Sequence, residues 1–255
     1  MPEPVDIASP DSAAFEPAPP AVRRPSAVHR FFVLASVALV AAYWSALATL
    51  YARNVIVGSF EHLSDFARGY AVAVVVEIAV VWVLLRGSGE RFADLGLSFA
   101  TLRDALRTRQ VYLAAVLLLV LQPFVALAYW WLSGNDPRPN PLADTMTTEN
   151  LPSWVLLSVF GGGVREELER AFCITRFERA FGTVGLVAAI LVDAVLFGRG
   201  HWNQGAAGMI TTGVMGLAFS LVFLWRRRVA DAMVAHAALD LIVLFALYAR
   251  PTQAG

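Results

Sequence analysis

The sequence predicts an all-α fold, a polytopic membrane helix bundle of about seven transmembrane helices with one interfacial amphipathic segment. Hydrophobic residues make up 58% of the 255 residues, whereas charged residues make up only 16%. A soluble domain carries about 25% charged residues. Apolar stretches close to the ~20 residues that cross a bilayer recur along the chain. Neither an alternating strand pattern nor an internal repeat accompanies them.

Charge and cysteine content exclude several classes of protein. The formal net charge is +0, so no basic excess points to nucleic acid, and we expect no nucleic-acid partner. The chain has 1 cysteine, Cys173, which excludes an internal disulfide and a metal site made of several cysteines. The expected partner at this level is the lipid bilayer.

The N-terminal end differs from the rest in composition. Residues 1–28 are rich in Pro, Ala and Ser, and Arg23, Arg24 and Arg30 lie near their end. This composition predicts a disordered N-terminal tail. The apolar stretch that follows is too long and too late in the chain for a signal peptide. We therefore expect a single transmembrane helical domain over residues 29–250.

The first half of the chain contains three predicted spans, at residues 31–51, 70–85 and 111–132. Glu77 lies inside the second span, where a structural carboxylate with a partner is favoured over a role in a site. Residues 86–110 are rich in Arg and place apolar residues at intervals among polar ones. That pattern predicts an interfacial amphipathic segment.

Loop charges predict the orientation. Residues 133–150 contain three acidic residues and one Arg. The tail, the 86–110 segment and the three arginines at 226–228 are basic and lie an even number of crossings apart. Basic loops face the cytoplasm. We therefore expect a multi-pass integral protein of the plasma membrane with its N-terminus in the cytoplasm.

The second half of the chain contains four further spans, at residues 151–181, 185–200, 205–225 and 229–249. Gly182 and Gly185 mark a turn between the first two, which form a hairpin. At about 1.5 Å per residue from that turn, Glu166 and His201 lie at the same height and face one another. His236 reaches this height only if the hairpin tip projects into the cytoplasm. This places the expected site in the inner half of the bilayer.

Charged residues inside the fourth span are candidates for a functional site, because a charge at membrane depth costs about 2.5–3.5 kcal/mol on insertion scales. Glu166 and Arg170 share one helix face, and an arginine can keep a carboxylate ionised and oriented. Glu167 points about 100° away but is three residues from Arg170. His236 and Asp240 are four apart and share a face of the last span.

These residues predict a particular chemistry. A carboxylate at Glu166, an imidazole at His201 and the His236–Asp240 pair come from three different helices. Such a set suits activation of a water molecule by a general base, with polar groups to stabilise an oxyanion. The same four side chains are permitted zinc ligands. We expect no cofactor, and a zinc-dependent variant stays open.

Three ordered motifs carry a resemblance to a known family. They are Glu166-Glu167 with Arg170, Phe197-x-x-x-His201, and His236-x-x-x-Asp240. They resemble the motifs of the CPBP (CAAX protease and bacteriocin-processing) intramembrane proteases, which include the type II CAAX prenyl endopeptidases. Residues 93–97, Ala-Asp-Leu-Gly-Leu, are also similar to a phrase that precedes the core helices of this family. The resemblance covers a protease-like core of about residues 90–245.

The resemblance implies an intramembrane endopeptidase that hydrolyses a peptide or protein substrate at the membrane. By it, Glu166 and His201 activate water, and His236 with Asp240 stabilises the oxyanion. The alternative is a catalytically silent member, that is, a membrane scaffold or a bacteriocin-immunity-type protein that binds a partner.

The first motif departs from the usual pattern, in which three residues separate Glu-Glu from the arginine. Here only two residues intervene. Either Glu166 and Glu167 are the pair and Arg170 comes one residue early, or Arg170 is in register and Arg165 replaces the first glutamate. Both readings keep Glu166 as a glutamate of the motif.

The third motif departs as well, because Asp240 stands where asparagine is common. An ionised carboxylate cannot donate a hydrogen bond to an oxyanion. We therefore expect Asp240 to orient His236, or to bind a metal if one is present. Asp193 lies about two turns before His201. It either orients the site or serves as a hydrogen-bonded structural acid.

Overall fold

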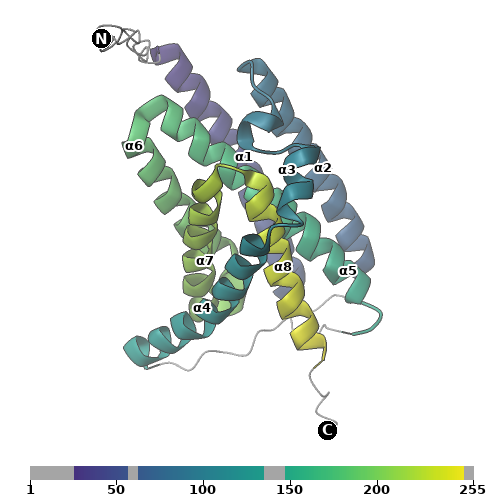
Figure 1. The fold of residues 1–255 in the computed structure, drawn as a ribbon. Coiled ribbons are helices and arrows are strands. Elements are labelled where there is room, and N and C mark those ends of the chain that lie inside the picture. The colour runs from purple at the N-terminus through teal and green to yellow at the C-terminus, as the bar shows by residue number, and fades with distance from the viewer. Residues whose placement is uncertain (1–25, 57–62, 135–146, 250–255) are drawn as a thin grey trace, which may run out of the picture.

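A computed structural model describes residues 26–56, 63–134 and 147–249 (Figure 1). The predicted tail over residues 1–28 lies almost entirely outside these ranges. The described residues form helices, turns and short connections without any strand. The all-α prediction is therefore confirmed for the part of the chain that the structure describes.

The helices follow the predicted spans closely. In chain order they are α1 (Ala27–Ile56), α2 (Leu63–Gly87), α3 (Phe99–Ala105), α4 (Arg109–Ser133), α5 (Leu151–Leu156), α6 (Glu167–Gly200), α7 (Gly205–Arg226) and α8 (Val229–Tyr248). Shorter helical turns join them: η2 (Phe92–Leu95), the π-helix η4 (Leu157–Glu166) and η5 (Trp202–Gln204). Every predicted span lies within these helices, except that the last one extends a residue beyond α8.

Length and composition make these helices suitable for a bilayer. Within the described residues, 5 helices are long and apolar enough to cross a membrane, and Arg30–Tyr43 of α1 is a shorter apolar segment. One of the five is the 50-residue run Leu151–Gly200, which is not straight. In lipid each backbone N–H and C=O group must be paired internally, and helices achieve this within one segment.

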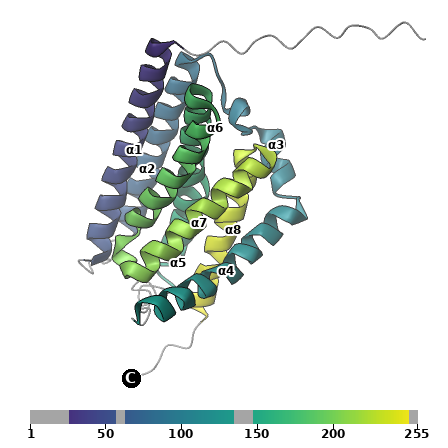
Figure 2. The same ribbon diagram turned by 90° about the vertical axis from the view of Figure 1, so that its left-hand side faces the viewer.

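Gly182 divides the long run into two arms. Its φ of 66° and ψ of −150° belong to a region that only glycine adopts without strain. Two views show the resulting turn of α6 extending beyond the α7–α8 turn, at the same end of the bundle as the start of α1 (Figures 1 and 2). This agrees with the predicted projection of the hairpin. The start and the end of α6 are thereby brought back to the same level.

Local sequence signals fix several helix ends. Ser98 caps α3 by accepting a hydrogen bond from the Thr101 backbone N–H at 3.1 Å. Pro152 occupies the first turn of α5, where a missing N–H is harmless. Gly134 ends α4 in the left-handed conformation.

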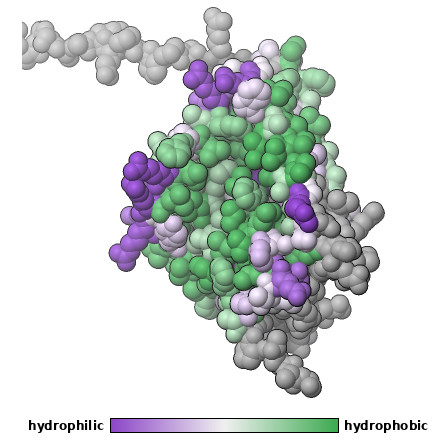
Figure 3. Space-filling model, turned by 90° about the vertical axis from the view of Figure 1, so that its right-hand side faces the viewer, coloured by the Kyte–Doolittle hydropathy of each residue, from purple (hydrophilic) through white to green (hydrophobic). Residues whose placement is uncertain are grey.

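Helix α8 is central to the arrangement. It packs against η4, α4 and α7, while α6 packs against α7 and α1. The largest buried cluster joins side chains from α2, η2, α6, α7 and α8, among them Leu85, Leu95, Phe172 and Phe223. Large apolar side chains on the outer faces of α2, α4 and the second arm of α6 remain exposed. Figure 3 shows a broad apolar face with hydrophilic groups near its edges, as a lipid-facing surface requires.

The predicted amphipathic segment at residues 86–110 is not one continuous helix but is divided into η2 and α3. Phe99 is 83% exposed, whereas Leu95 is fully buried in the core. Gly96, at a φ of 73°, turns the chain and packs against the backbone of Arg227 and Arg228. The turn directs η2 inward and α3 outward.

Candidate active site

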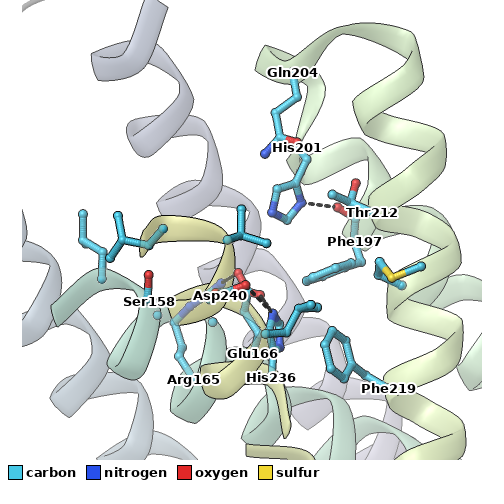
Figure 4. A pocket seen from close by; sticks show the side chains of 18 of the residues that line it. Ser158, Arg165, Glu166, Phe197, His201, Gln204, Thr212, Phe219, His236 and Asp240 are labelled. Atoms are coloured by element: carbon cyan, nitrogen blue, oxygen red, sulfur yellow. Dashed lines mark hydrogen bonds and ion pairs between the residues drawn. The ribbon is translucent and has the colours of Figure 1, made fainter. Parts of the chain in front are cut away.

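A cavity of about 270 Å³ lies where η4, α6, α7 and α8 meet (Figure 4). Its polar lining includes four of the predicted site residues, Glu166, His201, His236 and Asp240. Its apolar lining comes from α5, α7 and α8 and includes Trp154, Met215, Phe219, Leu239, Val243, Leu244 and Leu247. The remaining predicted residues, Glu167 and Arg170, do not line the cavity. The structure thus brings residues from three separate motifs to a single space.

Three consecutive glycines in η4 make this convergence possible. A methyl group on Gly162 would collide with the Asp240 carboxylate, and one on Gly163 would press on Ala237. A methyl group on Gly161 would lie 3.1 Å from the Tyr70 ring of α2. The absence of side chains therefore lets η4 approach α8 on one side and α2 on the other. Such π-helical turns inside helices are frequent at functional sites.

His236 is held in one orientation by contacts at its ring nitrogens and on one face of its ring. Its Nδ1 lies 2.7 Å from Glu167 Oε1, and its ring stacks on Phe219 with centroids 4.0 Å apart and an angle of 17°. Its Nε2 faces Glu166 Oε2 at 3.8 Å and Asp240 Oδ1 at 3.7 Å. Because an ionised Glu167 can only accept, Nδ1 donates and Nε2 is the nitrogen presented to the cavity.

Arg170 holds Glu167 in place from behind the cavity wall. Its Nη1 donates to Glu167 Oε1, and its Nε donates to Asp193 Oδ2 at 2.8 Å. Its guanidinium also lies over the Phe197 ring, 4.7 Å from the centroid. Asp193 is therefore a hydrogen-bonded acid, which is one of the two roles that the sequence left open. That it also orients the site through Arg170 and Glu167 stays a prediction.

His201 ends the second arm of α6. Its Nδ1 lies 2.8 Å from the Phe197 carbonyl oxygen. A carbonyl only accepts, so Nδ1 carries the proton and Nε2 is the acceptor of the ring. Figure 4 shows His201 facing Glu166, Asp240 and His236 across the cavity. Glu166 and His201 thus line one cavity, and their joint action on a water molecule stays a prediction.

Glu166 and Glu167 have different surroundings although they are adjacent. Glu166 lines the cavity, and its Oε1 accepts a hydrogen bond from Arg165 Nη2 at 3.1 Å. Glu167 is turned away and pairs with Arg170 and His236. This geometry favours the reading in which both glutamates form the pair of the motif and Arg170 comes one residue early. Three-residue spacing still places Glu167 and Arg170 on one helix face.

Asp240 lies one helical turn after His236, at the open side of the cavity. Its side chain is 34% exposed and its Oδ1 is 3.7 Å from His236 Nε2, which is too long for a hydrogen bond. It contacts the position of Gly162 on η4. Asp240 is thus placed to act on His236 by charge and to meet a molecule that enters the cavity.

Sequence reasoning missed two features of this site. Phe219 of α7 was not recognised as the stacking partner of His236, because an aromatic residue in an apolar span carries no distinguishing pattern. The contact between Arg165 and Glu77 was also missed, at 3.7 Å between Nη1 and Oε2. The sequence shows opposite charges in two different spans, but it does not say which of them form a pair. The expectation that Glu77 is a paired carboxylate is confirmed.

A metal ion in this site would need several His, Cys, Asp or Glu side chains arranged around one point. Among the described residues, no group of three or more His, Cys, Asp and Glu side chains is placed to hold a metal ion. The expectation of a reaction without a cofactor, with zinc as the open alternative, stays a prediction.

Part of the chain that forms this site matches the model of a known protein family. Residues 148–242 match the family model described as Type II CAAX prenyl endopeptidase Rce1-like. No curated protein and no solved structure is matched. The matched region is narrower than the resemblance at residues 90–245 and leaves out the phrase at residues 93–97. It contains all three motifs and every predicted site residue.

Proposed function

We propose that this integral membrane protein, whose residues 148–242 carry an Rce1-like domain, is a glutamate-dependent intramembrane endopeptidase. The observation that carries the proposal is the convergence of Glu166, His201 and His236 on one cavity. The expected substrate is a peptide or protein at the membrane. Its apolar residues fit the apolar lining of the cavity. The expected location is the plasma membrane, with the N-terminus in the cytoplasm.

Water activation is assigned to Glu166 and His201. Arg165 occupies Oε1 of Glu166, so Oε2 is the oxygen left to accept a proton. His201 presents Nε2 as a second acceptor from the other side of the cavity. A water molecule between them can pass a proton to one acceptor while the other orients it for attack on the carbonyl carbon. The proton then goes to the leaving amine.

Oxyanion stabilisation is assigned to His236. When both ring nitrogens carry protons, Nε2 donates to the oxygen that gains charge in the transition state. The contact of Nδ1 with Glu167 and the stack on Phe219 fix the direction of that donation. Asp240 cannot donate when ionised, so its assigned role is to orient His236 and hold the ring charge.

The test is cleavage of a panel of membrane-associated peptides by the purified protein in detergent. Glu166→Gln and His201→Ala should each lower the rate at least about 100-fold, since positioned acid–base groups contribute about 10²–10⁴-fold. Glu178→Gln is the matched control. This glutamate pairs with Arg227 in an exposed contact remote from the cavity. The control should cleave like the wild type.

Two outcomes would contradict the proposal. Equal cleavage by wild type and Glu166→Gln would remove glutamate dependence. The scaffold would be indicated instead if the wild-type protein cleaved no peptide but bound a partner, and if the Glu166→Gln, His201→Ala and His236→Ala variants bound that partner equally well.

Treatment with a chelator tests for a metal requirement. The proposed reaction continues after dialysis against EDTA, whereas loss of activity that zinc restores would establish the metal-dependent alternative.

A further inference from the structure

We propose that Arg165 is a positioning residue that holds Glu166 for water activation and is itself anchored by Glu77 of α2. The inference rests on the proposed function and adds to it a contact between the matched domain and a helix outside it. Helix α2 precedes the matched region, which begins at residue 148.

Arg165 is placed to act on Glu166 directly. It is the next-to-last residue of the π-helix η4, directly before Glu166, is 2% exposed and lines the cavity. Its Nη2 donates to Glu166 Oε1 at 3.1 Å. Hydrogen bonds between two charged groups are stronger than neutral ones and fix direction. With Oε1 held in this way, Oε2 is the oxygen that faces His236 Nε2, at 3.8 Å.

The guanidinium is in turn held by groups from two helices. Its Nη1 lies 3.7 Å from Glu77 Oε2 on α2 and 3.8 Å from Glu169 Oε2 on α6. Its central carbon lies 5.8 Å from the centroid of the Tyr70 ring. The planar fork of an arginine can serve two carboxylates at once, whereas the ammonium of a lysine is a single point charge. Arg165 is therefore suited to link Glu77 to Glu166.

The bare backbone of η4 makes this link possible. Gly161 allows the Tyr70 ring to approach the π-helix, which brings α2 alongside Arg165. The contacts of Arg165 with Glu77 and Glu169 are long, at 3.7 and 3.8 Å, whereas its contact with Glu166 at 3.1 Å is a hydrogen bond. The direct bond to a cavity-lining carboxylate is what points to a role in the reaction.

The experiment compares Arg165→Lys, Arg165→Gln and Glu77→Gln with Arg176→Lys and Arg176→Gln. Arg176 is a matched control, because it is also a buried arginine on α6, pairs with Glu90 and does not line the cavity. For each variant we would measure kcat, KM and the melting temperature in detergent.

We expect Arg165→Lys to lower kcat about 10-fold, with KM changed less than about threefold and the melting temperature preserved, because misplacing a reacting group reduces turnover more than binding. Arg165→Gln should lower kcat about 100-fold. Glu77→Gln should lower kcat less than either. The double variant Glu77→Gln with Arg165→Lys should lower kcat by less than the product of the two single fold-reductions, because both substitutions act through one contact. The Arg176 variants should change stability without this selective loss of kcat.

The inference is overturned if folded Arg165→Lys turns over at the wild-type rate. It is also overturned if kcat falls in step with the melting temperature in the Arg165 variants just as it does in the Arg176 variants. That result would make Arg165 a structural residue. Should Arg165→Gln not fold, Arg165→Lys and Glu77→Gln decide the matter. Failure of the proposed function is distinguishable, because the wild-type protein itself would then cleave nothing and the premise would be gone.

Discussion

At the scale of single residues, the candidate site depends on the different roles of neighbouring charges. Arg170 is 1% exposed and serves two carboxylates, Glu167 on its own helix arm and Asp193 on the other. Glu167 passes this restraint to His236. A buried charge without partners is strongly unfavourable, so each member of this series requires the next.

Arg170→Gln should therefore destabilise the protein. It leaves the buried carboxylates of Glu167 and Asp193 without their cation, and breaking a buried pair costs about 3–5 kcal/mol. For a chain of this size that corresponds to a drop in melting temperature of roughly 10 °C. Arg227→Gln, which breaks an exposed pair with Glu178, should change stability by less than about 1 kcal/mol. Similar melting temperatures for the two variants in detergent would contradict the account.

At the scale of elements, η4 determines how closely α8 approaches the start of α6. Gly162→Ala tests this, because the added methyl group would collide with the Asp240 carboxylate. We expect cleavage to fall more than about 10-fold, since displacing groups by about 1 Å can reduce rates about 100-fold. Gly69→Ala on α2 is the control, because a methyl group there meets nothing within 4 Å. If Gly162→Ala and Gly69→Ala cleave equally, close packing at η4 is not required.

The attachment of α3 to the α7–α8 turn should depend on pH. Hydrogen bonds from Arg228 and Arg226 lower the pKa of Asp104. A carboxyl with a lowered pKa stabilises the fold above its unfolded pKa of about 3.9, and this contribution is lost as the pH falls through the lower folded value. The melting temperature of wild type should therefore exceed that of Asp104→Asn above about pH 4. The gap should close at lower pH, and a constant gap would contradict the assignment.

Sequence patterns predicted the elements well because their causes are local. Length and apolar composition define a span, and Gly182 defines the turn between two of them. The π-helix was not predicted, because its extra residue per turn depends on how η4 packs against α8 rather than on any periodicity. Nor could the pattern over residues 86–110 indicate that the turn at Gly96 directs Leu95 into the core.

The structure brings residues of the three sequence motifs to one cavity, whereas the roles of these residues stay predictions. The motifs identified Glu166, His201 and His236, and all three line the cavity. The sequence favoured Glu166 as a glutamate of the motif, but it could not fix the register of Glu166, Glu167 and Arg170. Nor could it pair Arg165 with Glu77, since long-range pairing between helices is set by the packed bundle.

At the scale of the whole molecule, a cavity with both polar and apolar lining lies inside a bundle that presents a broad apolar face (Figures 3 and 4). The helices that build it, η4, α6, α7 and α8, follow one another along the chain, and the hairpin of α6 brings its two ends together beside α8. Water can act inside such a bundle only where charged residues are collected and satisfied. This arrangement is the physical basis of the proposed hydrolysis.

The most direct test of water activation by Glu166 is a single-turnover cleavage in ¹⁸O-labelled water, with the fragments weighed by mass spectrometry. The account predicts that wild-type protein releases an N-terminal fragment with one ¹⁸O in its new carboxyl group. It also predicts that Glu166→Gln, at the same melting temperature, releases none above background. Labelled fragments formed equally by both proteins, or no labelled fragment from the wild type with any peptide of the panel, would contradict it.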